Sequence, residues 1–97
     1  MAVQHMVWMK FDESHGADRV RVHLDALVAL KGQVPGIADI SAGENFTDRA
    51  DGMTHGLLVT LESKAALKVY AEHPAHLAAA GPMKADASKL LAMDFEC

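Results

Sequence analysis

Hydrophobic residues alternate with other residues in four segments of the chain, a pattern typical of half-buried β-strands. The alternation is clearest over residues 3–11 and 54–61, weaker over 37–45, and returns over 90–95. In the first and third segments, one face carries a histidine followed by apolar residues. These are His5, Val7 and Met9, and then His55 and Val59. We expect this face to meet the helices.

Two regions between these segments carry apolar residues at helical spacing. Val20, Leu24 and Leu27 predict a helix over 18–30, and Ser63 is a suitable N-cap for a second helix over 64–72. Pro74 disfavours helical geometry at the preceding residue and should end that helix. We expect the helix to resume over 75–80, to break again at Gly81-Pro82, and to be followed by a short helix over 83–89.

The order strand, helix, strand, strand, helix, strand predicts an α+β, ferredoxin-like (βαββαβ) domain that spans residues 1–97. Two right-handed crossovers give an antiparallel sheet of order 4-1-3-2, with the helices on one face. The opposite face carries Met6, Trp8 and Leu58, and an exposed apolar patch of this kind usually marks an association surface. We therefore expect a homodimer in which the two sheets close on one another.

Composition narrows the class of protein. Apolar residues make up 51% of the chain and charged residues 23%, as in globular domains. The formal net charge of −4, without any run of basic residues, argues against nucleic-acid binding. The apolar runs are too short for a membrane helix. A single cysteine, Cys97, excludes an intrachain disulfide and fits a cytoplasmic protein, which is also what the lack of a signal-peptide pattern suggests.

Six histidines are the most informative feature of the sequence. His5 and His55 lie on the predicted helix-facing side of the two central strands, where an imidazole serves either a buried hydrogen bond or chemistry. The expected topology places His5 beside Asp94 of the last strand. The second helix should return His73 and His76 toward His55, at the other end of the sheet. One cavity that holds all of these residues would have to run along the sheet beneath the helices.

The segment His73-Pro74-Ala75-His76, with Tyr70 one turn earlier, is the densest polar constellation. A tyrosine and a histidine close together can act as general acid and base. Alternatively, the segment is a helix end where histidine caps the last turn. The proline disrupts the regular spacing that a zinc site on a helix would need, so we predict no metal and no cofactor. We expect His73 to cap the helix or to point outward.

Several of these motifs resemble the stress-responsive α/β-barrel (Dabb) domain family. The resemblance spans essentially the whole chain and rests on the segment from His5 to Phe11, Val34-Pro35-Gly36, Thr54-His55-Gly56, the His-Pro-Ala-His segment and Asp94-Phe95. It implies a ferredoxin-like protomer and a dimeric α/β barrel. Matching to a polyketide-cyclase branch of the family implies that Tyr70 and His76 form an acid/base pair.

The same matching implies a ligand cavity between sheet and helices. Its expected lining comprises His5, Val7, Met9, His23, Leu24, Leu27, His55, Val59 and Asp94. Where the cyclases have aromatic residues on the first helix, this chain has His23, Leu24 and Leu27. The first hypothesis is a Dabb protein that holds a small hydrophobic ligand, with its reaction unassigned. The second is a cofactor-free, aldol-type polyketide cyclase or lyase. A cofactor-free monooxygenase, suggested by Trp8 and Asn45, is a third.

Overall fold

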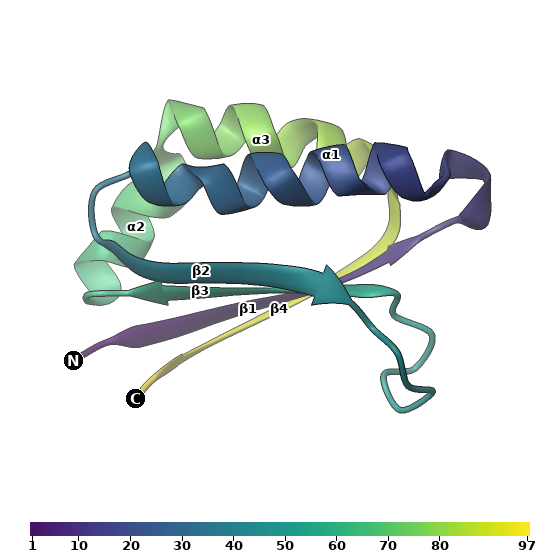
Figure 1. Ribbon diagram of the computed structural model, residues 1–97. Coiled ribbons are helices and arrows are strands. Elements are labelled where there is room, and N and C mark those ends of the chain that lie inside the picture. The colour runs from purple at the N-terminus through teal and green to yellow at the C-terminus, as the bar shows by residue number, and fades with distance from the viewer.

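Four strands and three helices build the protein, in a computed structural model that describes all 97 residues. The strands are β1 (Val3–Phe11), β2 (Ile37–Glu44), β3 (His55–Leu61) and β4 (Ala87–Glu96), and the helices are α1 (Ala17–Val28), α2 (Lys64–Glu72) and α3 (Pro74–Asp86). All three helices lie on one side of the sheet and leave the other side uncovered (Figure 1). The predicted α+β, ferredoxin-like fold is confirmed.

The sheet has the order β2-β3-β1-β4, and every neighbouring pair of strands is antiparallel, as the sequence predicts. The register fixes where the histidines lie. His5 is opposite Val59 of β3 and Asp94 of β4, whereas Met9 is opposite His55. His5 and His55 are therefore four positions apart along β1, or about 13 Å at the usual rise of a strand.

One continuous helix, α3, replaces the two short helices that the sequence predicts after Pro74. Pro82 lies inside this helix, so the expected break at Gly81-Pro82 is wrong. Pro82 and Ala78, whose carbonyl loses its helical partner, both lie on the exposed side, where water can bind that carbonyl. The predicted helix over 83–89 is also wrong at its end, because Ala87 opens β4 opposite Phe11.

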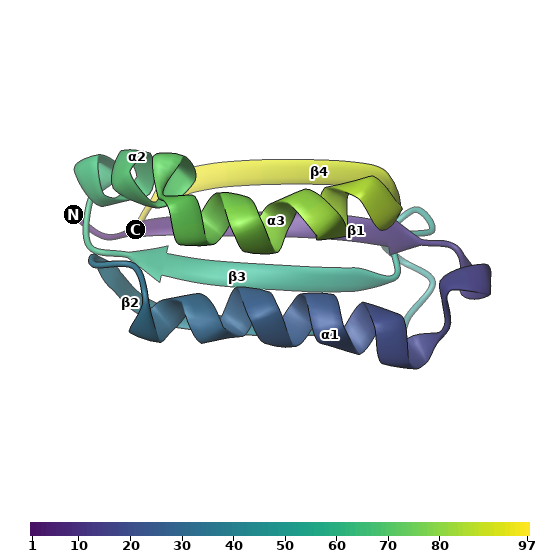
Figure 2. The same ribbon diagram turned by 90° about the horizontal axis from the view of Figure 1, so that it is seen from above.

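The apolar core fills the layer between the sheet and the helices. Met9, Val59 and Leu61 from the central strands are fully buried there, together with Leu27 of α1. Seen from above, α1 and α3 lie side by side across the sheet, with α2 at one end (Figure 2). Because α1 and α3 run along the strands, the packed core beneath them is what separates the two ends of the sheet.

The uncovered face of the sheet is rich in exposed apolar side chains. Trp8 of β1 is 42% exposed, and Leu58 of β3, Leu91, Met93 and Phe95 of β4 are exposed beside it. The register places Trp8 opposite Leu91, and Met6 opposite both Leu58 and Met93, so the side chains form contiguous rows. We call this set the bare face. None of the helices is long and apolar enough to cross a membrane.

Candidate active site

Tyr70 is the buried centre of a polar cluster at one end of the sheet. Ser63 is the N-cap of helix α2, and its hydroxyl accepts a hydrogen bond from the Ala66 N–H. The helix places Tyr70 in its last turn, with the side chain facing the core. The side chain is 1% exposed, and its hydroxyl is the only buried side-chain polar atom without a hydrogen-bond partner. Burial raises the pKa of Tyr70 to about 12. The phenol is therefore a protonated and unused donor.

The turn between α2 and α3 brings His76 against Tyr70. His73 is extended between the helices, and its Nδ1 accepts a hydrogen bond of 3.0 Å from the Ala75 N–H. Its side chain therefore caps the start of α3 and not, as the sequence suggested, the last turn of the preceding helix. Pro74 starts α3 with a favourable first-turn geometry. The rings of Tyr70 and His76 then lie with their centroids 4.3 Å apart.

His76 is held in a form that can accept a proton. Its Nδ1 lies 3.2 Å from the Ala71 carbonyl, which can only accept a hydrogen bond, so Nδ1 carries the hydrogen and Nε2 is left as the base. Burial lowers the pKa of His76, helped by Lys84 and His5, although the Ala71 carbonyl acts in the opposite direction. No carboxylate pairs with this imidazole. It is consequently neutral near pH 7.

His5 completes the cluster from the strand side. Its ring meets Tyr70 edge to face at a centroid distance of 5.7 Å, and its Nδ1 is hydrogen-bonded to Asp94 on the neighbouring strand. The predicted proximity of His5 and Asp94 is confirmed. The side chains of His5 and Asp94 are 15% and 41% exposed, so exposure increases from Tyr70 toward the β4 edge.

His55 lies apart from this cluster, so the expectation that His73 and His76 approach it is wrong. Helix α2 ends just before Pro74 and stays near the end of β3. Helix α3, rather than α2, therefore runs back along the sheet. His76 therefore lies next to His5, at the end of the sheet opposite His55. Residues expected to line one long cavity, namely Val7, Met9, Leu27 and Val59, are buried core residues that fill the layer between the two ends.

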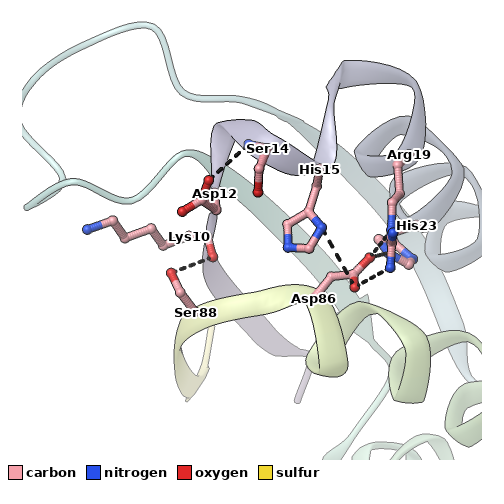
Figure 3. Close-up of polar contacts among 8 residues, drawn as sticks. All are labelled: Lys10, Asp12, Ser14, His15, Arg19, His23, Asp86 and Ser88. Atoms are coloured by element: carbon pink, nitrogen blue, oxygen red, sulfur yellow. Dashed lines mark hydrogen bonds and ion pairs between the residues drawn. The ribbon is translucent and has the colours of Figure 1, made fainter.

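A second polar cluster lies at the other end of α3 (Figure 3). Asp86, the last residue of α3, accepts hydrogen bonds from Arg19 Nε and Nη2 at 2.6 and 2.7 Å, and its carboxylate lies 2.7 Å from His23 Nε2. His15 Nδ1 lies 4.0 Å away. The hydrogen bonds from Arg19 and His23 lower the pKa of Asp86 to about 2. These residues tie α1 to α3.

His23 and His55 meet through a phenylalanine rather than through a ligand cavity. The Phe11 ring stacks on His23 at 6.1 Å and meets His55 edge to face at 5.4 Å. Sequence reasoning selected His23 and His55 but missed Arg19 and Asp86. These two lie 67 residues apart, and only the side-by-side packing of α1 and α3 brings them together.

The two main surface hollows lie away from Tyr70 and His76. One, of 770 Å³, runs between α1 and β2 and includes Leu24 and His55 among its lining residues. The other, of 430 Å³, lies on the bare face beside Trp8 and Leu58 and also reaches His55. Leu24, a predicted lining residue, therefore faces an open groove and not the Tyr70 cluster.

Comparison with known proteins shows which sequences and structures this chain is similar to. Residues 3–97 match the sequence profile of the stress-responsive A/B barrel (Dabb) domain. Olivetolic acid cyclase from Cannabis sativa is 29% identical over 97 residues, which cover 98% of this chain and 96% of the cyclase. A dimeric ferredoxin-like protein of unknown function from Jannaschia is 28% identical, with a TM-score of 0.87 and full coverage of both chains. A hydroxynitrile lyase from Passiflora edulis shares the fold at 20% identity, with a TM-score of 0.89 and coverage of 97% and 91%.

Proposed function

Because the chain belongs to the stress-responsive A/B barrel domain family, we propose that Tyr70 and His76 bind the carbonyl group of a small apolar compound and move its protons. The observation that carries this proposal is the unpartnered Tyr70 hydroxyl beside a neutral imidazole. A buried donor without a partner costs about 1–3 kcal/mol, and a ligand oxygen would recover that cost. The similarity to olivetolic acid cyclase supports a ring-forming reaction.

In the proposed step, the ligand's carbonyl oxygen accepts a hydrogen bond from the Tyr70 hydroxyl. His76 Nε2 removes a proton from the adjacent carbon, and the electron pair of that C–H bond forms an enolate whose oxygen Tyr70 stabilises. The enolate carbon then attacks a second carbonyl of the same molecule, which forms a C–C bond. The resulting alkoxide takes the proton back from His76. The cycle balances without an oxidant or a cofactor, and its reverse is a lyase reaction.

His5 and Asp94 have a supporting role in this proposal. The Asp94 carboxylate accepts the hydrogen on His5 Nδ1 and so fixes the orientation of the imidazole whose edge meets Tyr70. In this proposal the ligand enters at the β4 edge, which the increase in exposure from Tyr70 through His5 to Asp94 supports. Trp8 and Asn45 do not favour oxygenase chemistry, because Trp8 is on the bare face and the Asn45 amide is bonded to loop carbonyls.

The direct test is turnover of a linear 3,5,7-triketo acyl thioester, in which attack of C2 on the C7 carbonyl closes a six-membered ring, followed by liquid chromatography and mass spectrometry of the cyclised product. We expect His76→Gln to abolish turnover and His73→Ala to retain it, because the His73 side chain caps α3 and only its backbone N–H, which alanine keeps, is bonded to Tyr70. Circular dichroism checks that both variants fold. Equal loss of turnover and of thermal stability in both variants would make the segment a structural cap and overturn the proposal.

We also propose that two copies pair through the bare face in the cytoplasm. The similar Jannaschia protein is described as dimeric, and the contiguous apolar rows around Trp8 resemble the centre of an interface more than a solvated surface. Trp8→Asp should give a monomer or an aggregate in sedimentation velocity, since it buries an unpaired charge. A native chain that sediments as a monomer at micromolar concentration would contradict the dimer.

A further inference from the structure

The groove between α1 and β2 has an apolar wall and lies at the end of the sheet opposite Tyr70. It has a volume of 770 Å³ and is closed on one side by the loop between β2 and β3. Its apolar lining includes Phe11, Val20, Leu24, Val28, Ala42 and Met53. The volume falls in the range typical of small-molecule sites, and none of the residues of the proposed reaction lies in it.

His55 gives this groove a hydrogen-bond acceptor. The Thr54 hydroxyl has one hydrogen, which it donates to the Met9 carbonyl, so its oxygen accepts from the Phe11 N–H and from His55 Nδ1. The neutral imidazole therefore carries its hydrogen on Nδ1, and Nε2 is an acceptor with no partner in the protein. Burial lowers the pKa of His55, although Glu44 opposes this, so the ring is neutral near pH 7.

The rim of the groove is strongly acidic. Five carboxylates and one guanidinium line it: Asp12, Glu13, Asp25, Glu44, Asp48 and Arg21. This excess of four acids equals the formal net charge of the protein, which is −4. Glu13, Asp25, Glu44 and Asp48 form no ion pair with any side chain of the protein. A cleft with an excess of one sign of charge concentrates ligands of the opposite sign.

The spacing of these groups distinguishes between kinds of cation. No three acidic, histidine or cysteine side chains lie close enough together to hold a metal ion, so the negative charge is spread along an apolar wall. Such a lining complements a molecule with both an apolar body and an ammonium group. We propose that the α1–β2 groove binds an amphiphilic organic amine, with its chain against Leu24 and its ammonium group between His55 Nε2 and the carboxylates of Glu44 and Asp48.

The proposal is tested by calorimetric titration with octylammonium chloride below its micelle concentration. Octanol and octanoate test the charge of the head group, and spermidine tests charge without an apolar chain. We expect octylammonium to bind more tightly than all three, and its affinity to fall as salt is added. Equal binding of octanoate, tighter binding of spermidine, or no binding of octylammonium at millimolar concentration would overturn the proposal.

Matched variants locate the site. Glu44→Gln/Asp48→Asn should weaken octylammonium binding about tenfold, whereas Glu62→Gln/Glu72→Gln, which removes the same charge outside the groove, should change it less than about twofold. Leu24→Asn tests the apolar wall of the groove. If Leu24→Asn fails to fold, the Glu44→Gln/Asp48→Asn variant still decides the test, because it changes only exposed carboxylates. The same loss in both double variants would contradict a site in the groove. Turnover at Tyr70 is unaffected by any of these outcomes.

Discussion

The molecule contains two aromatic rings, each flanked by two histidines, at opposite ends of the sheet. Tyr70 lies between His5 and His76, and Phe11 lies between His23 and His55. The ring distances are similar, between 4.3 and 6.1 Å. One hydroxyl group distinguishes the two arrangements: the Tyr70 oxygen is buried without a partner, whereas Phe11 has no polar atom to satisfy.

The carboxylates beside the two arrangements differ as well. Asp86 is 9% exposed and is bound by Arg19 and His23, so its hydrogen-bonding capacity is used within the protein. Asp94 is 41% exposed and contacts His5 alone. The Phe11 arrangement stabilises the packing of α1 on α3 through Asp86. The Tyr70 arrangement instead keeps a donor, the Tyr70 hydroxyl, and a base, His76 Nε2, without a partner in the protein. Similar ring geometry therefore serves structure at one end and, in our proposal, chemistry at the other.

The sharpest way to break this comparison is Tyr70→Phe, which removes the hydroxyl that distinguishes the Tyr70 arrangement from the Phe11 arrangement. We expect turnover of the triketo thioester to fall at least about 100-fold, since a general acid is lost. Stability should stay the same or rise by about 1 kcal/mol, because an unsatisfied buried hydroxyl is removed. Urea unfolding checks the second part. A large loss of stability would show that the hydroxyl is a structural group after all.

The reverse change, Phe11→Tyr, places a hydroxyl between His23 and His55 in the Phe11 arrangement. Phe11 is buried in a packed layer, so the added oxygen must displace its neighbours and should lower stability by about 1–3 kcal/mol. We expect no new activity, measured on the same thioester. Unchanged stability would mean that His23 or His55 can rearrange to accept the new hydrogen bond.

Neutralising the two carboxylates sharpens the comparison further. Asp86→Asn should lower Tm by several degrees, because Arg19 and His23 lose their common charged partner. Asp94→Asn should lower Tm less, since Asp94 is more exposed and has one partner. Differential scanning calorimetry on the two variants measures both effects. The opposite order of the two Tm changes would contradict our account of which end is structural.

The smallest expected effects are in the pH dependence of stability. The pKa of folded His76 is lowered from 6.5, so the unfolded chain protonates first, and stability falls as pH drops below about 6.5. The pKa of Asp86 is lowered from 3.8 to about 2, so its contribution is complete above pH 3.8 and is lost as pH falls toward 2. Urea unfolding across this range should show a flatter profile for His76→Gln near pH 6 and for Asp86→Asn near pH 3. An unchanged profile in either variant would contradict that assignment.

The sequence predicted the strands well because their alternation reports directly which face is buried. It predicted His5 next to Asp94 for the same reason, since strand order and register follow from the topology. It failed at Gly81-Pro82, because whether a proline interrupts a helix depends on which side of the helix faces water. The error about His76 followed from assigning the return path to α2 instead of α3. Neither the Asp86 cluster nor the filling of the interior by Met9 and Leu27 has a local signal in the sequence.

Proton exchange at a carbon beside a carbonyl tests the central claim most directly, because it requires only Tyr70 and His76 and no second carbonyl. The probe is 2-heptanone in deuterium oxide, and NMR follows the loss of hydrogen at its C1 and C3 positions. We predict exchange faster than in buffer with the native protein, slower exchange with Tyr70→Phe, and none above buffer with His76→Gln. Exchange at the buffer rate with the native protein, or at the native rate in both variants, would contradict the claim.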